Sequence, residues 1–403
     1  SKTEGSAAAS NEDLSGTITF AIWDNNLNDF IESNDMVGKF QEKYPDIDIE
    51  IEKIKDDSEY WNAMKMRASA NQLPDVMFNK TFTLARFKEY LLDLSDTEAA
   101  KNNELAAGYA IDGKILGIPM TSGYEYVYYW KDMFKEAGVE VPQTKDDFFK
   151  VCDTFMEKGI YPMVHPYNFI HGVFHELDSY FTSMAAATGN EDVWMKSQKG
   201  EAELSGNATV KEAMEMFSKL ASYKDAGDTA VDQTQGIQNF AAEQRPMYIN
   251  GGWLMGDTLA ANPDGEFGMF PMPWSNNPDD NKMWVGIDDC FVISSQTQHK
   301  DEVMKLMEFI ANDESSKTWM STAKLMPSNV NVSVDDENDL IKAIKSYMDE
   351  GKIVSKSLVP DYTSEFSTAF RTKLQEFVTL DDSQRDVDKL LKDIDAEIAS
   401  IRQ

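Results

Sequence analysis

The order of hydrophobic and polar positions predicts alternating strands and helices in the first eighty residues. Apolar side chains recur at every second position in 18–22 and 47–51, which is the period of a strand. Between these strands the spacing is typical of a single helix that ends at Pro45 and carries an apolar face formed by Phe30, Val37, Phe40 and Tyr44. A helix over 60–69 and a strand over 76–78 follow. Strand, helix and strand in this order favour a parallel α/β arrangement.

Helices dominate the middle of the chain, and short strands separate them. Helices are expected at 131–137, 145–155, 172–187, 208–223, 235–242, 253–261, 301–311 and 315–324, and from Leu340 nearly to the end. Strands are expected at 124–130, 247–249, 267–270, 285–287 and 290–293. Gly138 is a natural left-handed cap for the first of these helices, and Thr144 with Asp147 opens the next. Three prolines in 271–278 predict a loop.

Composition limits the partners that this chain can have. Its 403 residues exceed one ordinary core and favour two or three domains. Asp and Glu number 70 against 38 Lys and Arg, and the net charge of −32 repels nucleic acid and anionic membrane surfaces. An apolar fraction of 42% is enough for a packed core, so the acidity is expected to form a solvated shell. No apolar run approaches the ~20 residues that cross a bilayer.

The N-terminal segment and the cysteines add two smaller expectations. The first fourteen residues are small and polar, which predicts a flexible tether and therefore an anchor. Cys152 and Cys290 are too few for a disulfide framework, and both are expected to be buried thiols.

Most familiar catalytic and metal-binding patterns are missing from the sequence. The glycine-rich nucleotide loops and the Gly-x-Ser-x-Gly motif do not occur, so no cofactor is expected. His171 and His175 are four residues apart and Glu176 is adjacent, but His-Glu-x-x-His and a third ligand are missing, so we reject a zinc site. The acidic runs 279–280 and 335–339 lack the ligand spacing of an EF-hand and are interpreted as solvated loops.

Two functions stay open on the residues considered so far. A glycosidase needs only paired carboxylates, and 70 acidic residues produce such pairs by chance. A binder of peptides or amino acids would need an arginine fork for a carboxylate, for which Arg86 and Arg245 are the candidates.

Four of the eight tryptophans lie where a ligand could reach them. Trp23 follows the first strand, Trp253 follows Asn250-Gly251-Gly252, and Trp274 and Trp284 flank the proline loop. A pyranose has an apolar C–H face that can lie on an indole ring and hydroxyls that carboxylates and amides can bind. Ligands of parallel sheets bind beyond the carboxyl ends of the strands. The pattern therefore favours a sugar, and four such rings favour an oligosaccharide. The other four are expected in the core, namely Trp61, Trp130, Trp194 and Trp319.

Several ordered segments resemble one known family. They are Phe40-Gln-Glu-Lys-Tyr-Pro-Asp-Ile-Asp-Ile49, Leu73-Pro-Asp-Val-Met-Phe78, Tyr128-Tyr-Trp-Lys-Asp-Met-Phe-Lys-Glu-Ala-Gly138, Arg245-Pro-Met-Tyr-Ile-Asn-Gly-Gly-Trp253, Phe270-Pro-Met-Pro273 and Gly286-Ile-Asp-Asp289. Their order is similar to that in the extracellular solute-binding proteins of family 1, the carbohydrate-binding components of ABC importers, which have a maltose-binding-protein-like plan. The resemblance spans nearly the whole chain.

This resemblance implies a two-lobed α/β protein whose hinge the chain crosses three times. The limits expected are a tether at 1–14, an N-terminal lobe at 15–122 plus 288–327, and a C-terminal lobe at 123–287 plus 328–403. A carbohydrate would bind in the cleft and stabilise a closed form that a membrane permease recognises, with no bond made or broken. The resemblance also implies a monomer on the extracellular face of the membrane, held by a lipid on a cysteine upstream of residue 1.

The resemblance also transfers a set of ligand contacts by position. Together with Trp274 and Trp284 from the tryptophan pattern, the expected contacts are Trp23, Asp24, Asn25, Asn79, Lys80, Tyr124, Glu125, Tyr167, Asn168, Trp253, Asp288 and Asp289. No catalytic residue and no metal ligand is expected.

Overall fold

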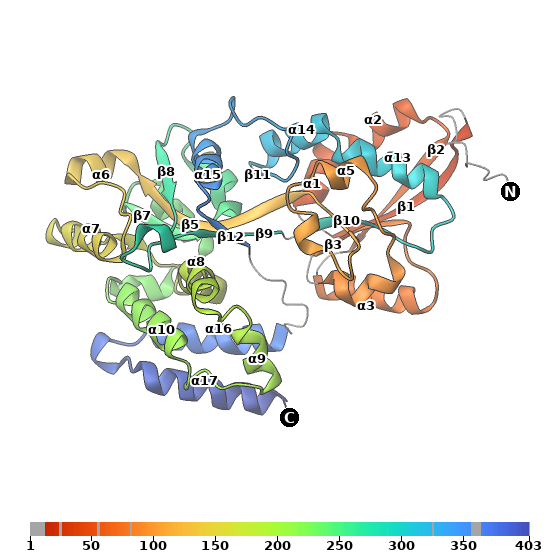
Figure 1. The fold of residues 1–403 in the computed structure, drawn as a ribbon. Coiled ribbons are helices and arrows are strands. Elements are labelled where there is room, and N and C mark those ends of the chain that lie inside the picture. Colours follow the sequence, from red (N-terminus) through yellow and green to blue (C-terminus); the bar gives the residue numbers. More distant parts are fainter. Residues whose placement is uncertain are drawn as a thin grey trace. The chain divides into compact units, whose positions relative to one another are not determined.

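The computed structural model divides the chain into two compact units, coloured along the sequence in Figure 1. It describes residues 13–23, 26–54, 57–80, 83–287, 289–324, 326–355 and 364–402. Unit 1 takes the chain up to Ser122 and Ile287–Ser333, and unit 2 takes Gly123–Gly286 and Val334–Gln403. The chain therefore passes from one unit to the other three times.

Unit 1 is built on a mixed sheet, and its described strands follow the order β2-β1-β3-β10-β4. Their bounds are β1 Gly16–Trp23, β2 Ile47–Ile54, β3 Val76–Lys80, β4 Ile118–Pro119 and β10 Asp289–Ile293. β1 pairs in parallel with β2 and β3, whereas β10 is antiparallel to β3 and β4. In β1 the side chains of Ile18, Phe20 and Ile22 are almost fully buried, because the strand lies inside the sheet. Among the described strands of unit 1, the predicted parallel pairing is found for β1, β2 and β3, and β10 departs from it.

The helices of unit 1 are mostly short. They are α1 Asn26–Ser33, α2 Met36–Lys43, α3 Asp57–Ser69, α4 Leu84–Phe87, η3 Lys88–Tyr90, α5 Glu98–Lys101, η4 Ala107–Tyr109, α13 Lys300–Ala311 and α14 Asp313–Ala323, followed by strand β11 Met326–Pro327. The single helix predicted up to Tyr44 is wrong, since α1 and α2 are separate. Asp35 between them has φ 46° and ψ 49°, and its side chain accepts a hydrogen bond from the backbone N–H of Gly38. Asp35 therefore caps a new helix.

Unit 2 is built around β5, the long aromatic strand. The described strands follow the order β12-β9-β5-β7-β6, and β8 also pairs with β5. β11 pairs with Thr121 and Ser122, the first two residues of β5, which belong to unit 1. Their bounds are β5 Thr121–Trp130, β6 Met163–Val164, β7 Met247–Gly251, β8 Phe267–Phe270, β9 Met283–Ile287 and β12 Ile353–Ser355. β5 is antiparallel to β7 and β8. Trp130 at its end donates its indole N–H to the carbonyl of Phe240 at 2.6 Å.

Helices make up most of unit 2. They are α6 Lys131–Ala137, α7 Lys145–Glu157, α8 Ile170–Thr188, α9 Val193–Lys199, α10 Ala208–Ala221, η5 Ala226–Ala230, α11 Gln233–Ala241, η6 Gly252–Leu254, α12 Met255–Ala261, η7 Pro278–Asp280, α15 Asp339–Asp349, α16 Ser364–Val378, η8 Asp382–Gln384 and α17 Val387–Arg402. The long helix α8 packs against β7, α10 and α16, as Figure 1 shows. The predicted caps are confirmed: Gly138 is left-handed, and Thr144 accepts from the N–H of Asp147.

Two further sequence predictions need correction. The chain beyond Leu340 is not continuously helical, because Ile353–Ser355 forms β12 and pairs in parallel with β9. The stretch 328–333, which the predicted limits give to the C-terminal lobe, belongs to unit 1. Asn329 pairs with Asn103, and the N–H of Val330 bonds to the carbonyl of Asn102 at 2.9 Å. These backbone contacts keep the segment with the unit that precedes it.

The core contains the cysteines and most of the tryptophans expected there. Cys152 and Cys290 are both fully buried, as predicted. Trp130, Trp194 and Trp319 are buried, while Trp61 is half-buried. No helix within the described ranges is both long enough and apolar enough to span a lipid bilayer.

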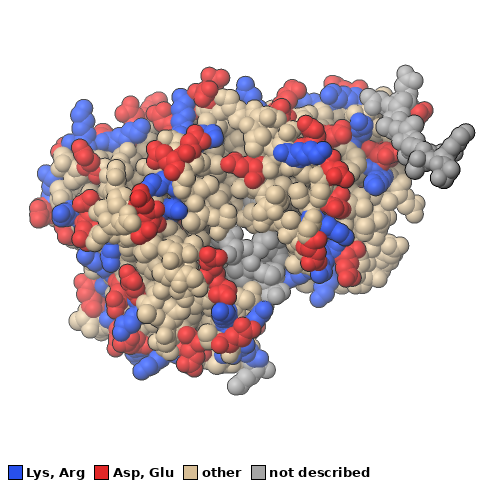
Figure 2. Space-filling view, in the orientation of Figure 1, with Lys and Arg blue, Asp and Glu red and all other residues tan. Residues whose placement is uncertain are grey.

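The surface charge is dispersed. On the face shown in Figure 2, Asp and Glu side chains lie among Lys and Arg without forming one continuous patch. Exposed pairs such as Lys345–Asp349 at 2.8 Å follow the helical i,i+4 spacing. Such pairs are worth little individually, so the acidic excess acts chiefly on solubility and on the choice of partners.

Candidate functional site

In unit 1, the predicted residues gather at one edge of the sheet. β1 and β3 are parallel and end there, and the antiparallel strand β10 begins there. Lys80 and Asp289 are register partners, and Lys80 Nζ lies 3.9 Å from Asp289 Oδ1. Both side chains are largely buried, with 15% and 12% exposed. This edge therefore holds a cation and a carboxylate that compensate each other.

Asn79 is the most unusual polar residue of this edge. Its side chain is fully buried, and neither the amide oxygen nor the amide nitrogen has a hydrogen-bond partner among the described residues. Burying an amide without partners costs free energy, so such groups are uncommon in folded proteins. Asn79 precedes Lys80 in β3, so their side chains leave the strand on opposite faces.

The structure describes the other unit 1 candidates only in part. Trp23 is the last residue of β1, and its backbone pairs with Ile54. Asp24, Asn25 and Asp288 lie outside the described residues. The predictions for these residues stay predictions.

In unit 2, three predicted residues form one cluster with a histidine. Glu125 of β5 is 1% exposed, and its Oε1 lies 2.6 Å from Nδ1 of His175 on α8. Its Oε2 accepts a hydrogen bond from the indole N–H of Trp284 on β9 at 2.9 Å. The Trp253 ring centroid lies 4.8 Å from that of His175 and 6.3 Å from that of Trp284. We call these four residues the Glu125 cluster.

Local backbone geometry explains why Trp253 reaches this cluster. Gly251 at the end of β7 is the register partner of Glu125, and Trp253 follows two residues later in η6. The Trp253 indole folds back over Gly251 and fills the space where a Cβ atom would stand. A side chain at position 251 would push the ring away from the cluster. Gly251 in the Gly-Gly-Trp segment therefore leaves the space that the Trp253 ring occupies.

The remaining unit 2 candidates lie elsewhere. Tyr124 is buried, with its hydroxyl 3.2 Å from the Met348 sulfur. Trp274 donates its indole N–H to Ser183 Oγ of α8 and to the carbonyl of Asp280, both at 3.1 Å. Asn168 is exposed, and its backbone N–H bonds to Val231. The structure does not bring these three residues to the Glu125 cluster.

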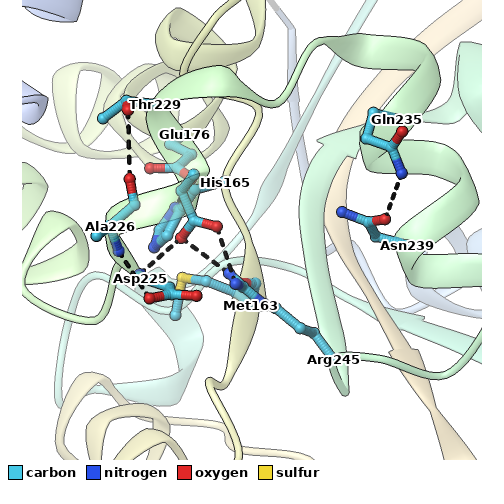
Figure 3. A network of polar contacts seen from close by, with 10 residues as sticks. Met163, His165, Glu176, Asp225, Ala226, Thr229, Gln235, Asn239 and Arg245 are labelled. Carbon is cyan, nitrogen blue, oxygen red and sulfur yellow. Dashed lines mark hydrogen bonds and ion pairs between the residues drawn. The ribbon is translucent and has the colours of Figure 1, made fainter.

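Tyr167 belongs instead to a buried network, part of which Figure 3 shows. Its hydroxyl donates to Glu176 Oε2 at 2.9 Å, and the other oxygen of Glu176 is bonded to His165 Nδ1. All three side chains are fully buried. Burial and the neighbouring Glu176 carboxylate raise the pKa of Tyr167 well above its usual value. The Tyr167 hydroxyl therefore stays protonated and donates a hydrogen bond to Glu176.

Arg245, a candidate anchor for a ligand carboxylate, is engaged inside unit 2. Its Nη1 bonds to the carbonyl of Met163 at 2.8 Å and to Asp228 Oδ2 at 2.9 Å, and its Nη2 lies 2.8 Å from Asp228 Oδ1. The two Asp228 contacts are the bidentate geometry that an arginine would use for a ligand. Arg86, the other candidate, is an exposed residue of α4 in unit 1.

The three residues considered for zinc point to different partners. His175 faces Glu125, Glu176 faces His165, and His171 is bonded to Arg371. Within the described ranges, no three His, Cys, Asp or Glu side chains come together in a way that could hold a metal ion.

His175 is the member of the cluster that sequence reasoning missed. In the sequence, His175 stands out only as a possible metal ligand, since His171 lies four residues before it. Its partner Glu125 is 50 residues away in the chain, so no local spacing connects them. The pairing arises because α8 packs against the central sheet of unit 2.

Comparison with known proteins gives the family. The family model of the bacterial extracellular solute-binding proteins matches residues 35–368, which is most of the chain. The melibiose/raffinose/stachyose-binding protein MelE of Bacillus subtilis is 24% identical over 308 residues, covering 74% of this chain and 71% of MelE. The multiple sugar-binding protein of Streptococcus mutans is 23% identical over 289 residues, covering 68% of this chain and 66% of that protein.

Solved structures agree on the fold. The solute-binding protein RafE in complex with raffinose superposes with a TM-score of 0.78 at 18% identity, covering 96% of this chain and all of RafE. At this identity the likeness concerns the fold alone, and it confirms the two-lobed α/β architecture that the sequence resemblance implies. The family match decides the identity: this chain belongs to the bacterial extracellular solute-binding proteins.

Proposed function

We propose that this protein captures an oligosaccharide outside the cell and delivers it to the permease of an ABC importer. Three lines support the proposal: membership of the family, relatives named for melibiose, raffinose, stachyose and multiple sugars, and the chemistry of the Glu125 cluster. The ligand binds and leaves unchanged, so the protein needs no catalytic group.

The Glu125 cluster is the observation that carries the proposal. It combines the rings of Trp253 and Trp284 with a histidine and a carboxylate in one small region of unit 2. Trp253 is only half-buried, so part of its ring is available to a ligand. An exposed indole beside hydrogen-bonding groups matches the two kinds of surface that a pyranose has. We therefore propose Trp253 as the principal stacking surface of unit 2.

The edge of the unit 1 sheet is a second candidate ligand-binding surface. Its described residues are Trp23 at the end of β1, Asn79 and Lys80 at the end of β3, and Asp289 at the start of β10. Asp24, Asn25 and Asp288 lie outside the described residues, and we include them by their positions in the sequence alone. The amide of Asn79 supports a role in binding, because it is buried without a hydrogen-bond partner among the described residues and such a group is retained at a cost. Variants in each unit test the two surfaces separately.

The alternatives receive less support from the described residues. A glycosidase acid or nucleophile must reach the substrate, whereas both oxygens of Glu125 are occupied by His175 and Trp284. A peptide binder would use an arginine fork, whereas Arg245 is bound to Asp228. We extend the proposal to a monomer on the extracellular face of the membrane, with the N-terminal segment as a tether to a lipid anchor.

A thermal-shift screen tests the proposal. A ligand that binds only the folded state raises the midpoint of unfolding in proportion to its affinity. We expect a rise with at least one of raffinose, stachyose, melibiose, lactose and chitin oligosaccharides, and none with free amino acids or short peptides. A response to peptides alone would contradict a sugar-binding function. New reducing ends after incubation with the sugars would contradict a function without catalysis.

A further inference from the structure

The carboxylate of Glu125 is held on both sides by side-chain donors of its own unit. Oε1 faces His175 Nδ1 at 2.6 Å, and Oε2 accepts from Trp284 Nε1 at 2.9 Å. A carboxylate accepts hydrogen bonds and does not donate them, so His175 directs Nδ1–H at Glu125. Glu125 is also the most buried of these three residues, with 1% of its surface exposed against 7% for Trp284. The carboxylate is therefore less accessible to solvent than the two rings that it hydrogen-bonds.

Both donors are rings whose orientation matters for binding. An indole can stack on a sugar only when its plane is presented correctly. The hydrogen bond at Nε1 restricts the rotation of the Trp284 ring, and the bond at Nδ1 restricts that of the His175 ring. Trp253 packs against both rings, with centroid separations of 4.8 Å and 6.3 Å. The orientation of all three rings therefore depends on one carboxylate.

From this arrangement we infer that Glu125 is a positioning residue, which orders His175, Trp284 and Trp253 for the sugar and does not itself contact it. The inference rests on the proposed function and changes the role that the sequence resemblance gives to Glu125. It also adds His175 to the residues that shape the binding surface. A residue that hydrogen-bonds a ligand-binding side chain acts by preorganisation. It lowers the conformational entropy that the side chain would otherwise lose when the ligand binds.

The first test needs no ligand. Nitrogen-15 NMR of the imidazole ring reports which nitrogen of His175 carries the proton. We expect the neutral ring to carry it on Nδ1 in the wild type. In Glu125→Gln the amide N–H₂ can donate to Nδ1, and we expect the proton to move to Nε2. A wild-type ring protonated on Nε2, or a ring unchanged by Glu125→Gln, would overturn the inference.

The second test separates positioning from direct contact by double-mutant cycles, with raffinose as the probe. We expect Glu125→Gln to weaken binding about tenfold alone and less than about twofold in a His175→Gln or Trp284→Phe background, because the carboxylate acts through those rings. If Glu125→Gln weakens binding as much in the His175→Gln and Trp284→Phe backgrounds as in the wild type, Glu125 contacts the sugar directly. No loss in any background would mean that it has no part in binding. The two cycles are independent, so one background that fails to fold leaves the other.

Glu176→Gln is the matched control. Glu176 also accepts from a histidine and an aromatic donor of unit 2, but its histidine, His165, is fully buried, whereas His175 is 15% exposed. We expect Glu176→Gln to lower the melting temperature and to leave raffinose affinity within about twofold, since its two partners, His165 and Tyr167, lie inside the core. A loss of affinity equal to that of Glu125→Gln would mean that any buried carboxylate of this unit has the same effect, which would overturn a specific role for Glu125. If wild type binds none of the sugars of the thermal-shift panel, the proposed function fails, and the NMR result still decides the role of Glu125.

Discussion

Unit 2 holds two carboxylate–histidine pairs that differ chiefly in burial. In the first pair, His165 and Glu176 are both completely buried. In the second pair, the side chain of His175 is 15% exposed and that of Glu125 is 1% exposed. Each carboxylate also accepts from an aromatic donor, Tyr167 in the first pair and Trp284 in the second. The same chemistry is thus used once inside the core and once where a ring reaches solvent.

The two pairs share one helix. His175 and Glu176 are consecutive residues of α8, and successive side chains on a helix leave it about 100° apart. The side chain of His175 therefore points toward Glu125 of β5, and that of Glu176 points into the core. The comparison suggests that the buried pair holds the interior together, whereas the second pair organises a surface for a ligand.

The largest expected effect is on stability, from removal of the buried carboxylate. Glu176→Ala would leave the His165 Nδ1 and the Tyr167 hydroxyl without their partner in a fully buried region. We expect the free energy of unfolding to fall by about 3–5 kcal/mol, the usual cost of breaking a buried pair. Urea denaturation followed by circular dichroism measures it.

Glu125→Ala provides the comparison for this effect. Water can reach His175, so its freed Nδ1 can be solvated, and we expect a smaller loss of about 1–3 kcal/mol. Equal losses for the two variants would break the distinction between a structural pair and a binding pair.

A smaller effect of opposite sign is expected in unit 1. Asn79 buries an amide that has no hydrogen-bond partner among the described residues, so Asn79→Leu removes a polar group that those residues do not satisfy. We expect the free energy of unfolding to rise by about 1 kcal/mol and raffinose binding to weaken. Thermal denaturation and calorimetric titration measure the two quantities. A less stable variant would show that the amide is satisfied in the native protein, as the two carboxylates of unit 2 are.

The smallest effect concerns a histidine of α8 whose neighbour is cationic. Partial burial and the Arg371 guanidinium lower the pKa of His171 below its usual value. The folded state therefore binds this proton less readily than the unfolded state, so protonation of His171 lowers stability as the pH falls through the unfolded-state pKa. An NMR titration should show the pKa of His171 rising toward its usual value in Arg371→Gln. An unchanged pKa would leave burial as its sole cause.

The sequence was sufficient for most elements and for the family. Alternating residues in 18–22 and 47–51 became β1 and β2, and the caps at Gly138 and Thr144 were predicted correctly, because these features depend on local spacing. The break at Asp35 was missed, since the apolar spacing continues across it and a left-handed Asp has no pattern of its own. β12 was missed because a three-residue strand exists only through its pairing with β9.

The candidate site could be predicted only as a set of positions. Trp253 and Trp284 were identified from their places after a glycine pair and a proline loop, and the structure brings both to Glu125. The sequence could not place Tyr167 in the buried network, because a tyrosine at the start of a helix fits either a core or a surface. It could not connect His175 to Glu125 either, since a pair of residues that far apart meets only through tertiary packing.

Calorimetric titration of Trp253→Ala with raffinose, beside wild type and Trp274→Phe, tests the central claim most directly. Trp253 is half-buried in the Glu125 cluster, whereas the indole N–H of Trp274 is bonded within its own region of unit 2. We predict that Trp253→Ala weakens binding at least about tenfold, or about 1.4 kcal/mol, while Trp274→Phe stays within about twofold of wild type. Unchanged affinity in Trp253→Ala, with the melting temperature preserved, would contradict the assignment of the sugar-binding surface to the Glu125 cluster.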